Sequence, residues 1–199
     1  MRQTAPDLPA PMLLRAGLGW YLWVGLCLLL SGLAAGAQTA DPDGLKRLSV
    51  LIGRWEGSSE GQPGKGTVRR EYTHALDARF IRVVNRSEYP AQEKNPKGEI
   101  HEDEGFFSFD RARKKTVLRQ FHVEGFVNQY VEDNSSSPTK FVFVTESIEN
   151  IPAGWRARET YVINGPDEFE EIFELAENGK PFEIYSRARL KRVREREPR

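Results

Sequence analysis

Cysteine, histidine and methionine are scarce in this chain. Its 199 residues include one cysteine, three histidines and two methionines, and they carry no net charge. The single cysteine, Cys27, lies in an apolar N-terminal run, so a disulfide framework is excluded for the rest of the chain. The balanced charge gives no electrostatic reason to bind nucleic acid. The motifs of P-loop proteins, dinucleotide-binding proteins, serine hydrolases and zinc proteases are also absent. We therefore expect no nucleic-acid partner, no catalytic residue and a non-enzymatic role.

Long hydrophobic runs are equally scarce, and the one present lies near the N-terminus. Leu18 to Ala37 is almost entirely apolar, follows Arg15 and ends in small residues of the A-x-A type. This pattern predicts a signal peptide over residues 1–37 and a secreted or periplasmic protein. The alternative is an uncleaved N-terminal membrane anchor, because the run is near the length of a spanning helix. Met12 is an alternative start to Met1.

Residues 38–199 are predicted to form a single domain built almost entirely of strands. Asp43 precedes an apolar-periodic stretch from Leu45 to Leu51 that Gly53 ends, which predicts one short helix. After it, segments of alternating character are separated by turn residues. These segments predict ten strands: 54–59, 67–74, 79–89, 105–109, 116–122, 127–131, 141–147, 156–163, 168–175 and 182–190.

The connections between these strands are too short for parallel pairing, which needs crossovers of a dozen residues or more. Antiparallel sheets of this size form barrels or sandwiches. Several segments, such as 79–86 and 156–161, carry polar groups on both faces. A sandwich would present one apolar face, whereas a barrel around a cavity tolerates polar groups inside. The fold class predicted is all-β, a ten-stranded antiparallel lipocalin-like barrel capped by the helix, and such a barrel would hold a small molecule.

The histidines offer two candidate sites. His122 ends a predicted strand and could face the cavity, where a hydrogen-bonded structural histidine is the other interpretation. His101 belongs to the dense stretch His101-Glu102-Asp103-Glu104, which we place in a polar loop over 90–103 and its junction with the next strand. Such a loop could hold a hard cation, or its carboxylates could anchor the backbone.

Strand residues with basic and phenolic side chains are the candidate ligand-binding set. A buried guanidinium holds a carboxylate strongly, and tyrosines line mixed cavity walls well. We therefore predict a hydrophobic or amphipathic ligand, and whether this ligand carries an acidic group is left open. The alternative without a ligand is an interaction module whose interior is filled by its own side chains. The predicted ligand-binding residues are Arg70, Tyr72, Arg82, Arg119, His122, Tyr130, Arg158 and Tyr161.

Two stretches resemble the nitrobindin family and its fatty-acid-binding-protein-like relatives. They are Leu51-Ile52-Gly53-Arg54-Trp55-Glu56-Gly57 and His101-x-Asp103-x-Gly105-Phe106-Phe107. The chain is also similar to a group of uncharacterised secreted bacterial proteins. The resemblance implies a ten-stranded barrel that binds haem b and acts on nitrogen oxides. The family's iron ligand is a histidine on the last strand, and the matching position here is Tyr185. Tyrosine can ligate ferric haem, but strand alternation turns Tyr185 away from the face of Phe182, Ile184 and Leu190 unless a bulge intervenes.

Overall fold

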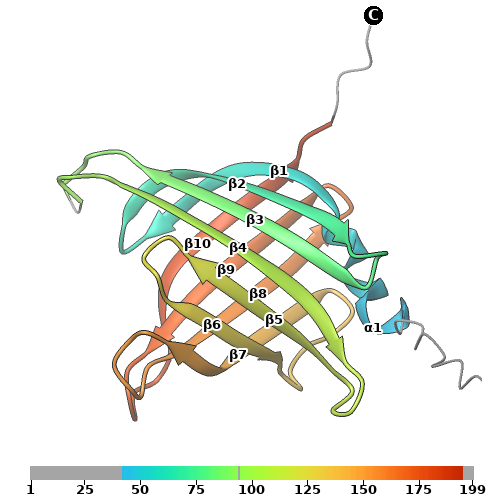
Figure 1. The fold of residues 1–199 in the computed structure, drawn as a ribbon. Helices are drawn as coiled ribbons and strands as arrows, with labels where there is room; N and C mark the ends of the chain where they lie inside the picture. The colour runs from blue at the N-terminus through green and yellow to red at the C-terminus, as the bar shows by residue number, and fades with distance from the viewer. Residues whose placement is uncertain (1–41, 94, 195–199) are drawn as a thin grey trace, which may run out of the picture. The chain divides into compact units, whose positions relative to one another are not determined.

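The computed structural model describes residues 42–93 and 95–194, which form a closed antiparallel barrel (Figure 1). The barrel closes because β1 pairs with both β2 and β10. Around the barrel the order is β1-β10-β9-β8-β7-β6-β5-β4-β3-β2, so every strand lies next to its neighbours in sequence. The strands are β1 (Gly53–Gly61), β2 (Gly64–Ala75), β3 (Phe80–Tyr89), β4 (Glu99–Asp110), β5 (Lys115–His122), β6 (Val127–Glu132), β7 (Lys140–Glu149), β8 (Arg156–Gly165), β9 (Glu168–Ala176) and β10 (Glu183–Arg192).

A short helical segment precedes the barrel and covers one of its ends. It consists of α1 (Pro42–Lys46) and the 3-10 helix η1 (Arg47–Leu51), and it lies where β2 and β4 finish (Figure 1). Leu48 and Leu51 are each 1% exposed, and they pack on the barrel core. The indole of Trp55 in β1 donates a 2.7 Å hydrogen bond to the carbonyl of Leu51. This bond satisfies an unpaired carbonyl at the end of the helical segment.

The last strand also ties down the helical segment. The guanidinium of Arg192 donates to the carbonyls of Val50 and Ile52, and it lies 4.1 Å from the Trp55 ring centre. Gly53 has a φ of 126°, and a Cβ there would come within 2.7 Å of the Arg192 guanidinium. Gly53 therefore permits a tight entry into β1 that leaves room for Arg192.

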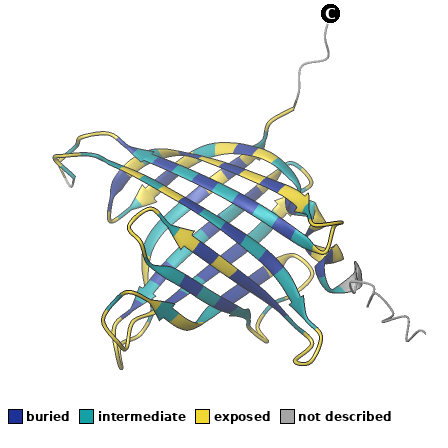
Figure 2. Ribbon diagram, viewed as in Figure 1, coloured by how far each residue is buried: buried dark blue, intermediate teal, exposed yellow. Residues whose placement is uncertain are grey.

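Burial alternates along the strands, with inward side chains mostly buried and outward ones intermediate or exposed (Figure 2). Near the helical segment the inward positions carry large rings that contact one another edge-on or tilted. Trp55 and Phe169, for example, lie 4.7 Å apart between ring centres at 80°. These rings fill that half of the barrel and make it the hydrophobic core. The rings are Trp55, Tyr72, Phe107, Phe143, Tyr161 and Phe169.

The predicted fold class is confirmed, as are the short helix and the ten strands, with shifted boundaries. One local prediction is wrong: His101, Glu102 and Asp103 do not lie in a loop, because β4 begins at Glu99 and pairs with β3 from that residue. The predicted signal peptide over 1–37 lies outside the described residues. In the part that is described, no helix has the length and hydrophobicity that crossing a membrane requires.

Candidate functional site

A cavity of about 730 Å³ occupies the half of the barrel away from the helical segment. It is formed where odd-numbered strands end and even-numbered strands begin, with Tyr89, His122 and Leu175 from the former and Glu99 and Tyr185 from the latter. Its volume lies in the range of small-molecule sites. Part of its wall is apolar and comes from β7, β9 and the β5–β6 and β7–β8 connections: Phe126, Ile148, Ile151, Trp155, Phe173 and Leu175.

The deep wall of the cavity contains a buried ion pair. Arg70 of β2 and Glu171 of β9 are 7% and 9% exposed, and two guanidinium nitrogens of Arg70 contact the carboxylate at 2.7 and 3.1 Å. The third nitrogen donates to Ser87 and to two backbone carbonyls. Burial opposes the charge of Arg70, but the Glu171 carboxylate outweighs it and raises the pKa of the guanidinium. Arg70 therefore lines the cavity as predicted, but with its donors already engaged by the protein.

The other three predicted arginines do not reach the cavity. Arg82 and Arg158 lie on the outer face, where they pair with Glu104 and Glu174 of neighbouring strands. Arg119 is also exposed on the outer face, where it donates to the amide of Gln129. Side chains alternate along a strand, and these three arginines occupy the outward register. The prediction that they meet a ligand inside the barrel is a misassignment of strand face.

The three predicted tyrosines all point inward, but at different depths. Tyr130 lines the cavity, and its hydroxyl accepts a 2.9 Å hydrogen bond from Asn128. Tyr72 and Tyr161 belong to the hydrophobic core. The hydroxyl of Tyr161 donates to Glu159, whereas that of Tyr72 is buried without a hydrogen-bond partner among the described residues. Only Tyr130 of the three therefore lies on the cavity surface.

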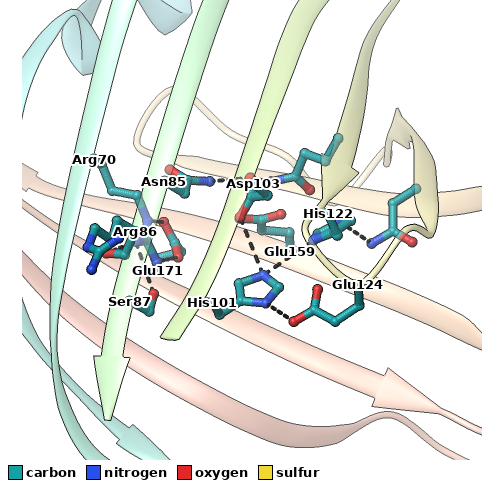
Figure 3. A network of polar contacts seen from close by, with 12 residues as sticks. Arg70, Asn85, Arg86, Ser87, His101, Asp103, His122, Glu124, Glu159 and Glu171 are labelled. Atoms are coloured by element: carbon teal, nitrogen blue, oxygen red, sulfur yellow. Dashed lines mark hydrogen bonds and ion pairs between the residues drawn. The ribbon is translucent and has the colours of Figure 1, made fainter. Parts of the chain in front are cut away.

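A polar cluster from β4 and β5 forms another side of the cavity (Figure 3). His101 and Asp103 are two residues apart on β4 and face inward, and Asp103 pairs in register with His122 of β5. His101 Nε2 lies 3.6 Å from Asp103 Oδ2 and 3.3 Å from His122 Nδ1. Glu102 projects outward and pairs with Arg86 instead. The strand thus separates the residues that the predicted loop had placed together.

Amide side chains hold the Asp103 carboxylate from behind. Its Oδ1 accepts hydrogen bonds from Asn85 Nδ2 at 2.8 Å and from Gln120 Nε2 at 3.3 Å. Gly105 is the next inward position of β4, and a Cβ there would come within 2.8 Å of the Gln120 side chain. The glycine of the His-x-Asp-x-Gly pattern therefore leaves the space through which Gln120 reaches Asp103.

The two histidines of this cluster have opposite pKa displacements. Burial opposes protonation of His101, but contacts with Asp103 and Glu124 outweigh it and raise its pKa to about 9. Burial, assisted by the neighbouring His101, lowers the pKa of His122 to about 4. Burial also opposes ionisation of Asp103, but the histidines and Arg70 outweigh it and lower its pKa. At neutral pH the cluster therefore holds a carboxylate, an imidazolium and a neutral imidazole.

Glu159 of β8 is a further buried carboxyl group on the cavity wall and is 4% exposed. Burial raises its pKa to about 8, and the nearby carboxylates of Glu171 and Asp103 add to the effect. Sequence reasoning missed this group and Glu171. Both occupy inward positions of their strands, Glu159 between Ala157 and Tyr161, so the signal was an acidic residue on the apolar face of an alternating segment.

Tyr185 lies on the cavity wall because the register of β10 shifts. A bulge between Ile184 and Ser186 interrupts the pairing with β9, and Tyr185 faces the cavity while Ile184 is exposed. The Tyr185 ring packs edge-on against Phe173 at 5.8 Å. Its hydroxyl makes no hydrogen bond to any other residue that the structure describes. A bulge was the condition under which strand alternation permits this orientation, and the structure contains it.

A family model described as "THAP4-like, heme-binding beta-barrel domain" matches residues 44–192, which cover β1 to β10. The chain belongs to this family. The resemblance to nitrobindin drawn from the two sequence stretches is thereby confirmed. Tyr185, which the resemblance places at the position of the family's iron ligand, lies within the matched residues.

Solved structures support the fold. The crystal structure of Rv2717c from M. tuberculosis is similar, with 21% sequence identity, a TM-score of 0.59, and coverage of 76% of this chain and 98% of that chain. A protein with unknown function of the DUF3598 family from Nostoc punctiforme has 9% identity and a TM-score of 0.27, with coverage of 75% and 99%, and supports no conclusion. No curated protein sequence matches the chain.

Proposed function

We propose that this barrel binds haem b in its cavity, with Tyr185 as the iron ligand. The observation that carries the proposal is the β10 bulge, which turns Tyr185 onto the cavity wall in a chain of the haem-binding family. Without that bulge, Tyr185 would point outward and Ile184 inward. The proposal replaces the acidic ligand suggested by the arginines, because Arg70 is already engaged by Glu171.

The residues of the cavity fit a large, flat and mostly apolar group. The wall formed by Ile148, Ile151, Trp155, Phe173 and Leu175 supplies apolar contact. Trp155 is 36% exposed, which leaves part of its surface open to a ligand. Each Å² of apolar surface that a ligand removes from water favours binding by about 25 cal/mol. The wall would hold the porphyrin faces.

Tyr185 suits the role of iron ligand better than His122 does. Both ring nitrogens of His122 face partners, His101 at 3.3 Å and Asn128 at 3.2 Å, and its ring stacks on Phe126 at 4.0 Å. Moving His122 to an iron would break these contacts. The Tyr185 hydroxyl has no such bonds to lose within the described part of the chain.

Bound ferric haem would supply an iron centre whose remaining coordination position can take small molecules such as nitrogen oxides. The chain's own contribution would be to hold and shield that centre. Phe173 packs against Tyr185 and limits its motion. Glu99 and Glu124 lie at the same end of the barrel and would disfavour anions there.

The test is a titration of the purified chain with ferric haem, followed by its Soret absorption. The wild type should bind one equivalent with the spectrum of a phenolate-ligated ferric haem, and Tyr185→Phe should lose that spectrum. Tyr89→Phe is the matched control, because Tyr89 also lines the cavity but bonds to Ser59. The proposal fails if haem causes no Soret change or if Tyr185→Phe leaves the spectrum intact.

We also propose that the protein is exported, on the basis of residues 1–37 alone. The measurement is N-terminal sequencing of the protein recovered from cells expressing the full chain. A mature N-terminus at Gln38 is expected. An intact N-terminus in the membrane fraction would support the anchor instead.

A further inference from the structure

The polar cluster on β4 and β5 has the spacing of a metal site. One ligand atom from each of His101, Asp103 and His122 lies within 4.8 Å of the other two. His101 Nε2 is 3.3 Å from His122 Nδ1 and 3.6 Å from Asp103 Oδ2. Bonds of about 2.0–2.2 Å from a tetrahedral metal to nitrogen and oxygen place two ligands about 3.3–3.5 Å apart. The two separations measured from His101 Nε2 are therefore close to those that one ion requires.

Each of the three side chains is also held through the atom that would not bind the ion. Asp103 uses Oδ1 to accept from Asn85 and Gln120, which leaves Oδ2 towards the histidines. His101 uses Nδ1 to contact the Glu124 carboxylate at 2.8 Å. Supporting contacts of this kind, a carboxylate behind a histidine above all, are typical of protein metal sites because they orient the ligands.

His122 is supported in the same way. Its Nε2 faces the amide of Asn128 at 3.2 Å, and its ring stacks on Phe126 at an interplanar angle of 18°. Asn128 Oδ1 is buried and has no hydrogen-bond partner in the part of the chain that the structure describes. A half-turn of this amide would direct that oxygen at Nε2–H and leave Nδ1 free to bind an ion.

Unpaired buried acceptors beside the cluster indicate that something polar completes it. Asn85 Oδ1 and Gln120 Oε1 have no hydrogen-bond partner among the described residues, and both residues are 3% exposed and line the cavity. Buried acceptors are normally satisfied, because leaving one unpaired destabilises the folded state. Water bound to an ion would supply donors to such oxygens.

We propose that His101, Asp103 and His122 bind a divalent transition-metal ion whose open coordination position faces the cavity. Two imidazoles and one carboxylate suit zinc or ferrous iron, whereas calcium and magnesium prefer oxygen ligands. The ligands of this site lie on β4 and β5, whereas the proposed iron ligand Tyr185 lies on β10 and lines the same cavity. The site differs from a hard-cation loop, because Glu102 and Glu104 point outward and pair with arginines.

The experiment is a calorimetric titration of the chelator-treated full chain with Zn²⁺, repeated with Co²⁺ to read the visible absorption of its coordination sphere. One equivalent should bind. Asp103→Asn and His122→Gln should each weaken binding at least 10-fold and change the Co²⁺ spectrum. Glu124→Gln should weaken it about 10-fold, since it removes only a supporting contact.

Two variants serve as matched controls. His74→Ala removes an exposed histidine of β2, and Glu99→Gln removes a carboxylate that could bind a metal with Glu124 through the other side of His101. Both should leave Zn²⁺ affinity within 2-fold of wild type, as should Tyr185→Phe. Far-ultraviolet circular dichroism and thermal melting should establish that each variant is folded.

Three results would overturn the proposal. They are the absence of one-equivalent binding, unchanged affinity in folded Asp103→Asn and His122→Gln, and loss of binding in Glu99→Gln. The first would identify the cluster as a hydrogen-bonded network without an ion. Because Tyr185→Phe is included, failure of the metal proposal and failure of haem binding are measured separately.

Discussion

The buried carboxyl group of Glu159 should make this protein less stable as pH rises. Its folded-state pKa of about 8 lies above the ordinary value of 4.5, because burial disfavours the charge and the carboxylates of Glu171 and Asp103 repel it. The phenol of Tyr161 and the guanidinium of Arg70 face it as well, but they do not reverse the shift. The native state therefore keeps a proton that the unfolded chain releases.

The sign and size follow from this proton. Between pH 4.5 and pH 8 the native state binds more protons than the unfolded state, so the free energy of unfolding falls as pH rises and then levels off. Each pH unit between the two pKa values corresponds to about 1.4 kcal/mol. The difference between the two pKa values of Glu159 therefore corresponds to a full loss of roughly 3 to 5 kcal/mol in the free energy of unfolding.

Glu159→Gln isolates this effect, because glutamine resembles the protonated acid and keeps an oxygen to accept the Tyr161 hydrogen bond. At pH 5, urea unfolding should give the wild type and Glu159→Gln free energies of unfolding within about 1 kcal/mol of each other. At pH 9 the variant should be more stable by roughly 3 to 5 kcal/mol. Glu60→Gln, on the exposed face of β1, should show no such divergence. A wild type minus variant difference that stays constant from pH 5 to pH 9 would refute the reasoning.

Three further predictions concern stability, each measured by urea unfolding at pH 7. Glu171→Gln should lower the free energy of unfolding by about 3–5 kcal/mol, because it leaves the Arg70 charge buried and unpaired. The double variant Glu171→Leu with Arg70→Met should lose less stability than Glu171→Gln. Gly57→Ala should lower the free energy of unfolding by about 1–3 kcal/mol or more, because its Cβ would lie 1.8 Å from a backbone oxygen of β10. A Cβ at Gly165 would have no atom within 4 Å, so Gly165→Ala should change that free energy by under about 0.5 kcal/mol. Trp55→Ala should cost about 3–5 kcal/mol, because it removes a buried ring and the hydrogen bond to the helical segment. Three results would contradict these accounts. They are equal losses of stability in the two glycine variants, a double variant no more stable than Glu171→Gln, and a Trp55→Ala variant as stable as the wild type.

Part of the candidate site can be predicted from the sequence alone. Tyr185 was identified through the family resemblance and His122 through its place at a strand end, and both line the cavity. The dense stretch around His101 was recognised as a candidate cation site, but with the wrong members, because it was placed in a loop. Once residues 99–110 form a strand, alternation sends His101 and Asp103 inward and Glu102 and Glu104 outward.

The ion pair of Arg70 with Glu171 shows a different limit. The two residues are 101 positions apart and lie on β2 and β9, which are not adjacent in the barrel. No local pattern specifies that contact. The arginine was therefore predicted to meet a ligand, when its partner is a residue of the protein itself.

Local chemistry thus settled the number of strands, their antiparallel pairing and the helical cap, because alternation, turn residues and short connections act over a few neighbouring positions. Closure of the barrel decided everything that depends on which residues face one another across it. It selected the inward register of each strand, it buried Glu159 and Glu171 in the cavity wall, and through one bulge in β10 it turned Tyr185 inward. Burial and electrostatic repulsion are properties of that closed interior, so the raised pKa of Glu159 is a property of the folded barrel alone.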